Sequence, residues 1–270
     1  MMETFKQEDM ATDLIPTSQP QILEETHTSY DMAHSKLGEF CPWGELLVES
    51  EVPGELKRSL VWITPNAESV VLKCARVSTD PSKVPAASTK LLSYLIHNKH
   101  WSPFEMVSLC LEIKTSRAIA RQMLRHRSFS FQEFSQRYQK LGTIQVKPLF
   151  QEARIQDLKN RQNSISTNDA ALHERWLQMQ QEVWDVAITR YNEAITMGIA
   201  KEQARALLPE GLTQSRLYMT GNLRSWIHYC QLRCENGTQK EHADIAKEIR
   251  SMLFSLVPTI AAASFPNVEY

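Results

Sequence analysis

The most informative stretch of this sequence is RHRSFSFQEFSQRY, residues 125–138. It holds three arginines, one histidine, one glutamate and three serines, with phenylalanines interleaved at positions 129, 131 and 134. Guanidinium groups bind phosphate and carboxylate oxygens two at a time, and serine hydroxyls can complete such sites. The phenylalanines indicate that the segment packs against an apolar core. We therefore predict an anion-binding site here; the alternative is a solvated basic helix end paired with Glu133.

The residues before this stretch predict a strand followed by a helix. Apolar and polar side chains alternate from Val107 to Lys114, as in a half-buried strand. Ser116 is a candidate N-cap for a helix that runs through Leu124 and places the basic cluster at its C-terminal end. Further upstream, the apolar runs 61–63 and 70–77 fit either a strand or a short helix.

The C-terminal half is predicted to be rich in helices. A long amphipathic helix ends at Gly198 and has one apolar stripe, formed by Leu177, Trp184, Ile188, Tyr191 and Ile195. A short helix over 201–208 stops before Pro209, and two more helices cover 221–234 and 239–256. We therefore predict an α+β fold, with a mixed β-sheet flanked by helices and the strands concentrated in the N-terminal half.

Composition divides the chain into an extension and one domain. Residues 1–40 are polar and lack periodicity, which predicts a flexible N-terminal extension ahead of a single domain over 41–270. Residues 150–170 are polar as well and predict an insertion at the surface.

Bulk charge and cysteine usage exclude several classes of protein. Thirty basic and 31 acidic side chains give a net charge of −1, which favours neither nucleic acid nor a membrane surface. No Gly-rich phosphate-binding motif occurs. The five cysteines form no C-x-x-C pair, so we expect no metal site and no disulfide framework. With no signal peptide or membrane-spanning run in the sequence, we expect a cytoplasmic protein.

Residues 125–138 resemble the signature of the flavin-dependent thymidylate synthases (the ThyX family). The match is Arg-His-Arg at 125–127, seven residues, then Ser135, with Glu133 and Arg137 also in place. Four further segments resemble the family's motifs in the same order: 75–78, 100–105, 202–209 and 222–239. The resemblance covers roughly residues 60–260. Met106 and Gln132 depart from the usual pattern, which affects local hydrogen bonds and not the reaction class.

The resemblance implies an enzyme with a ThyX-like fold. It would methylate dUMP to dTMP reductively, with 5,10-methylenetetrahydrofolate as carbon donor and NADPH as reductant through FAD. It would act as a homotetramer with sites at subunit interfaces, and without nucleic acid or a membrane as partner.

The resemblance also assigns roles to individual residues. Arg233 would be catalytic, by stabilising the ionised pyrimidine ring, and His100 would position flavin or folate. Residues similar to dUMP-binding positions are Gln122, Arg125, Glu133, Ser135, Gln136, Arg137, Arg205 and Arg233. Residues similar to FAD-binding positions are Ser102, Arg125, His126, Arg127, Glu133, Asn222, Arg224, His228 and Gln239.

Helical spacing agrees with these roles. Arg224 and His228 stand at i and i+4 on one face of the predicted helix, which favours a shared ligand. Alone, His228 fits a core histidine slightly better than a ligand-binding residue. Asn222 and Arg233 lie near opposite ends of the same helix, roughly 16 Å apart. A helix with polar groups at both ends suggests sites that are assembled between subunits.

Two alternatives remain open at this point. A related flavin-dependent enzyme that methylates or hydroxymethylates another pyrimidine nucleotide would need the same contacts. A nucleic-acid-binding module would use the arginines on phosphates and the phenylalanines for base stacking. The near-zero net charge counts against the second alternative.

Overall fold

The computed structural model describes residues 58–77, 89–138 and 147–268. The predicted extension over 1–40 and the predicted start of the domain at Cys41 lie outside these ranges, so the division into an extension and one domain stays a prediction. Among the described helices, none combines the length and the apolar character that crossing a bilayer requires.

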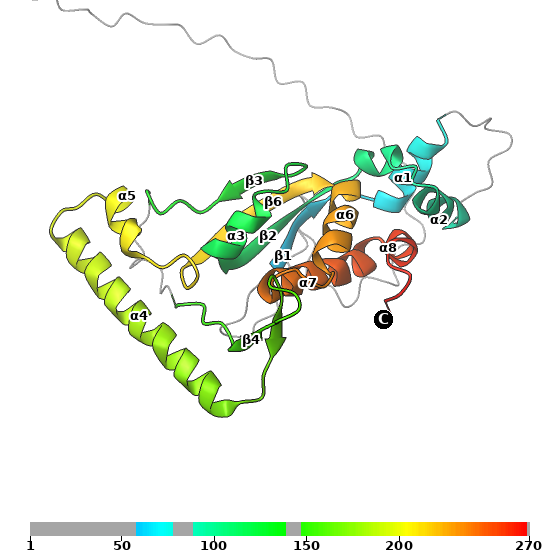
Figure 1. Ribbon diagram of the computed structural model, residues 1–270. Coiled ribbons are helices and arrows are strands. Elements are labelled where there is room, and N and C mark those ends of the chain that lie inside the picture. Colours follow the sequence, from blue (N-terminus) through cyan, green and yellow to red (C-terminus); the bar gives the residue numbers. More distant parts are fainter. Residues whose placement is uncertain (1–57, 78–88, 139–146, 269–270) are drawn as a thin grey trace, which may run out of the picture. The chain divides into compact units, whose positions relative to one another are not determined.

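A four-stranded sheet forms the centre of the described fold (Figure 1). The strand order is β1 (Arg58–Ile63), β2 (Ser108–Ser116), β6 (Gln214–Asn222) and β3 (Ser130–Glu133). The α+β class with helices flanking a sheet is confirmed, and the pairings of these four strands are all antiparallel. The strand predicted after Val107 is confirmed as β2. Of the two ambiguous runs, 61–63 belongs to β1 and 70–77 lies largely in helix α1 (Ala67–Ala75).

Strand β6 corrects two predictions. It lies in the C-terminal half, where we predicted no strand, and it pairs with both β2 and β3 in the middle of the sheet. The helix predicted from Gly221 begins only at Leu223, because Gly221 and Asn222 still pair with Leu109 and Ser108 of β2. The alternation of buried Ser215, Leu217 and Met219 with more exposed neighbours was the signal that we missed.

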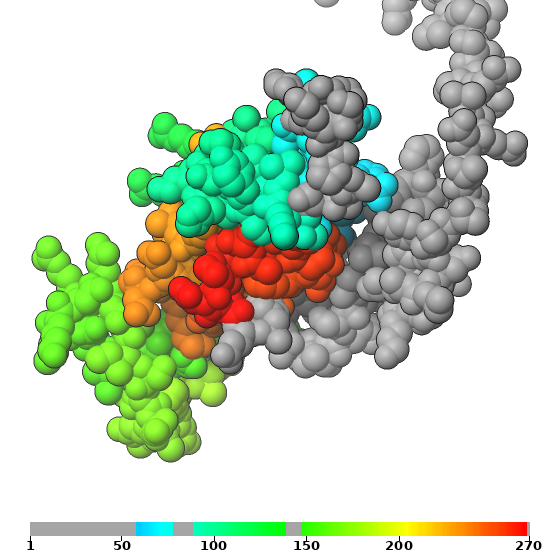
Figure 2. Space-filling view, turned by 90° about the vertical axis from the view of Figure 1, so that its right-hand side faces the viewer, coloured from blue at the N-terminus to red at the C-terminus, as the bar shows by residue number. Residues whose placement is uncertain are grey.

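Helices cover the sheet and bury the core. They are α2 (Thr89–His97), the 3₁₀ helix η2 (Ser102–Met106), α3 (Arg117–Met123), α6 (Leu223–Arg233), α7 (Lys240–Leu256) and α8 (Pro258–Ser264). The predicted N-cap of α3 is confirmed, since Ser116 Oγ accepts a hydrogen bond from the Ile119 amide at 3.3 Å. Helix α6 packs on α7, which also contacts β1 and α8. Helix α8 in turn packs on α2, and Figure 2 shows these C-terminal residues in red against the blue-green segment. The sequence did not predict α2 or α8.

Trp226 fixes α6 against the sheet. Its side chain is fully buried, and its indole N–H donates to the carbonyl of Leu109 in β2 at 3.3 Å. A buried tryptophan with its one polar atom satisfied contributes a large apolar area at no cost in unpaired hydrogen-bonding groups. The position of every side chain on α6 therefore depends on this anchor.

The predicted long helix is α4 (Ala170–Thr196), which starts at the N-cap Asp169 and ends just before Gly198 at φ 84°. Trp184 and Tyr191 are buried as expected, but Leu177 is 49% exposed, so its place in the apolar stripe was wrong. The short helix over 201–208 is confirmed as α5 (Lys201–Ala204) followed by the 3₁₀ helix η4 (Arg205–Leu207).

The polar insertion contains a small hairpin of β4 (Arg154–Gln156) and β5 (Ser164–Ser166). Most of its side chains are exposed, as predicted for an insertion at the surface. Arg154 is partly buried, and its Nη1 lies 2.7 Å from Oε1 of Glu241 in the first turn of α7. The hairpin is thereby tied to the N-terminus of α7.

Candidate functional site

At the C-terminal end of α6, two predicted site residues from distant parts of the sequence meet. Arg233 Nε donates to His126 Nε2 at 2.9 Å. The histidine ring must be neutral to accept this bond, and burial together with the nearby Arg233 charge lowers the His126 pKa to about 4. His126 therefore orients the guanidinium without neutralising its charge.

A second contact joins a predicted nucleotide-binding residue to a predicted flavin-binding residue. Gln122 Nε2, at the end of α3, donates to Gln239 Oε1, at the N-cap of α7, at 2.7 Å. Two residues that the sequence analysis missed lie next to this pair. His242 Nδ1 is 3.2 Å from Gln122 Oε1, and His242 Nε2 is 3.1 Å from the hydroxyl oxygen of Tyr229.

The ring of His242 is fully buried on the apolar stripe of α7. Burial, with smaller effects of Arg233 and His126, lowers its pKa to about 3. A histidine at a helical position otherwise occupied by Ala246, Ile249 and Leu253 was the signal that could have singled it out. Together, Gln122, His126, Tyr229, Arg233, Gln239 and His242 form what we call the α6 C-terminal network.

Positive charge without a carboxylate partner gathers around this network. Arg125 and Arg127 are exposed on the segment between α3 and β3, on either side of His126. Within the described ranges, neither of them nor Arg233 forms an ion pair. Three cations that lack internal compensation suit an anionic ligand such as a phosphate.

The N-terminal end of α6 carries a different group of predicted residues. Asn222 Oδ1 caps the helix by accepting from the Ser225 amide at 2.9 Å. Arg224 forms an ion pair with Glu105 of η2, and the His228 ring meets Trp101 edge-to-face at 4.6 Å between centroids. Burial, followed by the charge of Arg224, lowers the pKa of His228. We call Ser102, Asn222, Arg224 and His228 the α6 N-terminal group.

Two predicted residues at or just before η2 are exposed. Ser102 begins η2, and His100 lies just before it with its ring 5.9 Å from that of Tyr94. Among the described residues, the His100 side chain makes no other contact that would define a role in positioning flavin or folate. Its role stays a prediction.

The remaining predicted residues cluster where β3 ends. Glu133 accepts from Ser215 Oγ at 2.6 Å and lies 3.7 Å from Arg117 Nη1. Arg137 Nε lies 3.2 Å from Glu202 Oε2, and Arg205 Nε donates to the carbonyl of the same Glu202 at 3.2 Å. We call Glu133, Ser135, Gln136, Arg137 and Arg205 the β3 group.

Gln136 of the β3 group has a buried side-chain amide with an unsatisfied donor. Its side chain is only 3% exposed, yet its Nε2 has no hydrogen-bond partner among the described residues. Because an unsatisfied buried amide is costly, this donor indicates a partner beyond the described residues, such as a ligand or another subunit.

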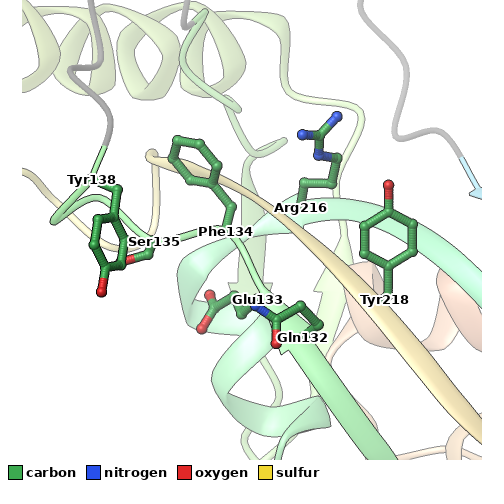
Figure 3. Close-up of a pocket in the computed structure, with 7 residues that line it drawn as sticks. All are labelled: Gln132, Glu133, Phe134, Ser135, Tyr138, Arg216 and Tyr218. Carbon is green, nitrogen blue, oxygen red and sulfur yellow. The ribbon is translucent and has the colours of Figure 1, made fainter. Parts of the chain in front are cut away.

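A pocket of about 260 Å³ opens beside the β3 group (Figure 3). Residues of β3 and the turn after it line one side, and Arg216 and Tyr218 of β6 line the other. The sequence analysis missed both β6 residues because it missed that strand. They add a cation and a phenol to a pocket that already contains Glu133 and Ser135.

In the described part of the chain, most of the predicted site residues thus fall into three separate groups. The α6 C-terminal network brings together Gln122, His126, Arg233 and Gln239, as a shared site requires. The α6 N-terminal group lies a helix length away, roughly 16 Å from Arg233. Glu133 pairs with Leu217 of β6, five residues from Asn222 and about 16 Å along the strand.

Comparison with known sequences identifies close relatives. A family model described as thymidylate synthase complementing protein matches residues 59–259. The flavin-dependent thymidylate synthase of Synechocystis sp. is 50% identical over 73% of this chain and 88% of the relative. The probable flavin-dependent thymidylate synthase of Paramecium bursaria Chlorella virus 1 is 44% identical over 73% of this chain and 90% of the relative.

Comparison with solved structures gives the same fold. The UMP/dUMP methylase PolB from Streptomyces cacaoi, bound with 5-Br dUMP, superimposes with a TM-score of 0.67 at 26% identity. The match covers 80% of this chain and 97% of that structure. A second structure of PolB, bound with 5-Br UMP, gives a TM-score of 0.65 at 27% identity.

Proposed function

The chain belongs to the thymidylate synthase complementing protein family, the flavin-dependent thymidylate synthases, and from this premise we propose how its site works. We propose that it methylates dUMP to dTMP reductively, with 5,10-methylenetetrahydrofolate as carbon donor and NADPH as reductant through FAD. The observation that carries the proposal is the hydrogen bond from Arg233 to His126, which joins the end of α6 to the Arg-His-Arg segment.

The residues present fit anionic ligands of this kind. Three arginines that form no ion pair among the described residues, Arg125, Arg127 and Arg233, lie in or beside the α6 C-terminal network, and the buried amide of Gln136 needs an acceptor. FAD supplies the redox chemistry when it is bound, so the protein has to bind, orient and polarise. The residues that would hold FAD are Ser102, Arg125, His126, Arg127, Glu133, Asn222, Arg224, His228 and Gln239.

The same geometry assigns a task to Arg233. A guanidinium stays protonated at any working pH, so Arg233 acts as a fixed positive charge and not as a base. Its Nε is held by neutral His126, which leaves both Nη groups to donate to the ligand. In this position Arg233 stabilises negative charge that develops on the uracil ring of dUMP. The nucleotide would also contact Gln122, Arg125, Glu133, Ser135, Gln136, Arg137 and Arg205.

A homotetramer with shared sites would unite the three groups. In support of this arrangement, the groups are separated by roughly 16 Å within one chain, and the Gln136 amide has no partner among the described residues. Mixing inactive Arg233→Ala chains with inactive Arg224→Ala chains tests it. If the two arginines serve one site from different subunits, activity returns in part; if mixed tetramers with exchanged subunits stay inactive, both arginines come from the same chain.

A product assay tests the function itself. The purified protein is expected to be yellow and to release FAD on denaturation. With dUMP, methylenetetrahydrofolate and NADPH it is expected to form a nucleotide with the mass of dTMP. A protein that releases FMN, or one that binds no flavin after reconstitution, contradicts the proposal. The predicted cytoplasmic location is a separate question and stays a prediction.

One observation favours a second candidate function. PolB, the solved neighbour, is a UMP/dUMP methylase, so a methylase with a wider choice of pyrimidine nucleotide shares this fold. Parallel assays with UMP and dUMP separate the two activities. The product mass also separates methylation from hydroxymethylation.

A further inference from the structure

A continuous chain of hydrogen bonds leads from the hairpin insertion into the α6 C-terminal network. Arg154 donates to Glu241, with Nη1 2.7 Å from Oε1 and Nη2 3.0 Å from Oε2. Glu241 Oε2 also accepts from Gln239 Nε2 at 2.9 Å. Burial raises the pKa of Glu241, but the bonds from Arg154 and Gln239 outweigh it and leave the pKa below its usual value. Glu241 is therefore an ionised carboxylate that can only accept.

The Glu241 carboxylate determines which group donates and which accepts in every hydrogen bond that follows. Because Glu241 only accepts, Gln239 must turn its NH₂ toward Glu241 and its oxygen toward Gln122. Gln122 then donates to Gln239 and turns its own oxygen toward His242. An oxygen facing His242 Nδ1 requires that this nitrogen carries the proton.

Tyr229 closes the chain at the other end. His242 Nε2 lacks a proton in this tautomer and accepts from the Tyr229 hydroxyl at 3.1 Å. Burial raises the pKa of Tyr229 far above its ordinary value, so the phenol keeps its proton as a donor. The six groups from Arg154 to Tyr229 thus have a single consistent set of proton positions.

We propose that His242 is a positioning residue that, as a neutral Nδ1-protonated imidazole, locks the Gln122 amide so that one N–H remains for the nucleotide. The inference rests on the proposed function. Within the chain of bonds, Gln122 uses one N–H on Gln239 and its oxygen on His242. Its second N–H therefore suits a carbonyl or phosphate oxygen of the pyrimidine nucleotide.

The energetics favour a positioning role over a purely structural one. A buried imidazole with two polar atoms adds less to stability than an apolar side chain of the same size, because each atom needs a partner. His126 and Arg233 are the charged or titratable side chains that also act on this ring, and both disfavour its protonation. Satisfied polar networks of this kind fix a unique arrangement of their members.

The tautomer of His242 can be observed without any enzymatic assay. In a ¹⁵N–¹H correlation spectrum of histidine-labelled, FAD-loaded protein, His242 is expected to be neutral and protonated on Nδ1 from pH 8 down to pH 5. Comparison with the His242→Asn spectrum assigns the signal. A signal from the Nε2-protonated form, or titration within this range, overturns the proposal whether or not the protein makes dTMP.

Three variants at position 242 separate the two bonds of the ring. Asparagine places an amide near Nδ1 and keeps the donor to Gln122, whereas glutamine places its amide near Nε2 and leucine keeps neither. We expect the dissociation constant for dUMP, titrated into FAD-loaded protein, to rise about tenfold in His242→Leu and His242→Gln, which corresponds to the loss of one buried hydrogen bond. In His242→Asn it should rise no more than about threefold.

The variants also need a readout that a general loss of structure would not reproduce. FAD content should stay normal, and KM for dUMP should rise more than kcat falls. The control His97→Asn changes an exposed histidine on α2 and should behave as the unmodified protein. Equal losses in His242→Asn and His242→Gln, or unchanged dUMP binding in His242→Leu, overturn the proposal.

Tyr229→Phe provides a second route if position 242 tolerates no change. The substitution removes the donor to His242 Nε2 and leaves the Gln122 oxygen facing Nδ1. We therefore expect the Nδ1-protonated form to persist in the same spectrum, and the dUMP dissociation constant to rise no more than about threefold. A signal from the Nε2-protonated form in this variant overturns the proposal. Failure of the unmodified protein to convert dUMP would instead refute the proposed function and leave the tautomer test standing.

Discussion

The two ends of α6 carry polar residues of the same kinds, but those at the C-terminal end are held by neighbouring side chains and those at the N-terminal end are more exposed. At the C-terminal end, Arg233 is held by the neutral ring of His126, which packs against the hydrogen-bonded side chains of Tyr229 and His242. At the N-terminal end, Arg224 and its partner Glu105 keep 42% and 35% of their side chains exposed. The side chains at the C-terminal end are thus positioned within a single chain before any ligand binds. Those at the N-terminal end are accessible to a ligand.

This difference indicates a division of labour along one helix. A preorganised cation stabilises developing charge without further reorganisation, which suits a catalytic role. An exposed ion pair contributes little to stability and can exchange its partner for a ligand at small cost. We therefore expect changes at the C-terminal end to affect turnover, and changes at the N-terminal end to affect the retention of flavin.

The largest expected effect comes from Arg233→Lys. Lysine keeps the positive charge but loses the planar fork, so it cannot hold His126 and the ligand together. We expect turnover to fall by about two orders of magnitude, as when one preorganised donor is removed, while flavin content stays near normal. Arg190→Lys, on the exposed face of α4, is the matched control and should leave turnover unchanged. Normal turnover in Arg233→Lys would remove this residue from the mechanism.

Stability toward acid should reveal the buried histidines of the C-terminal network. In the folded protein the pKa of His126 is about 4 and that of His242 about 3, against about 6.5 for an unfolded histidine. As the pH falls below 6.5, the unfolded chain binds protons that the folded chain does not, so the free energy of unfolding decreases. The slope is about 1.4 kcal/mol per pH unit for each histidine, and it levels off below pH 4 as His126 begins to protonate.

Denaturant unfolding at pH 7, 6, 5 and 4.5 measures this slope. His242→Asn removes one of the two titrating groups and should reduce the slope by about half of the contribution of the pair. The control is again His97→Asn, because that ring is exposed on α2. An unchanged slope in His242→Asn would mean that His242 is not neutral in the folded protein.

The contrast between the two ends could be predicted from the sequence only in part. The spacing of Arg224 and His228 placed them on one helical face, and the motif that contains Arg125–Arg127 marked the candidate site. Both are local patterns. The bond between Arg233 and His126 joins residues 107 positions apart, and no local pattern encodes it.

Long-range pairing also explains the errors in the fold. Strand β6 has an alternating pattern, but its length and its end at Asn222 depend on pairing with β2, about a hundred residues away. The helix prediction began two residues too early, at Gly221, because no local signal marks where the pairing with β2 ends; Asn222 is both the last residue of β6 and the N-cap of α6. His242 was missed because its partners Gln122 and Tyr229 lie on two other helices.

Gly221→Ala tests how tightly the start of α6 is fixed to the Arg-His-Arg segment. A Cβ at this position would lie 2.4 Å from Cδ1 of Phe129, a buried ring that follows Arg127 in the chain. We expect the free energy of unfolding to fall by about 1–3 kcal/mol, as for other overpacked cores. Gly211→Ala is the matched control, since its Cβ would meet nothing within 4 Å. Equal stability of both variants in thermal denaturation would show that Phe129 can move away freely.

The smallest expected effect on stability, and the sharpest test of the N-terminal end, comes from separating Arg224 and Glu105. Because the pair is partly exposed, Arg224→Gln and Glu105→Gln should each lower the free energy of unfolding by less than about 1 kcal/mol. Their effects on flavin retention should differ in sign. Arg224→Gln removes a cation that would bind the cofactor, whereas Glu105→Gln releases that cation from its internal partner.

The measurement is the fraction of FAD that remains bound after dilution, followed by its fluorescence. We expect Arg224→Gln to lose FAD faster than the unmodified protein, and Glu105→Gln to retain it at least as well. If the ion pair served only to join η2 to α6, removing either partner would break the same contact, and both variants would lose FAD equally. Such an equal loss would make Arg224 a structural residue and would end the contrast between the two ends of α6, because both would then be organised without a ligand.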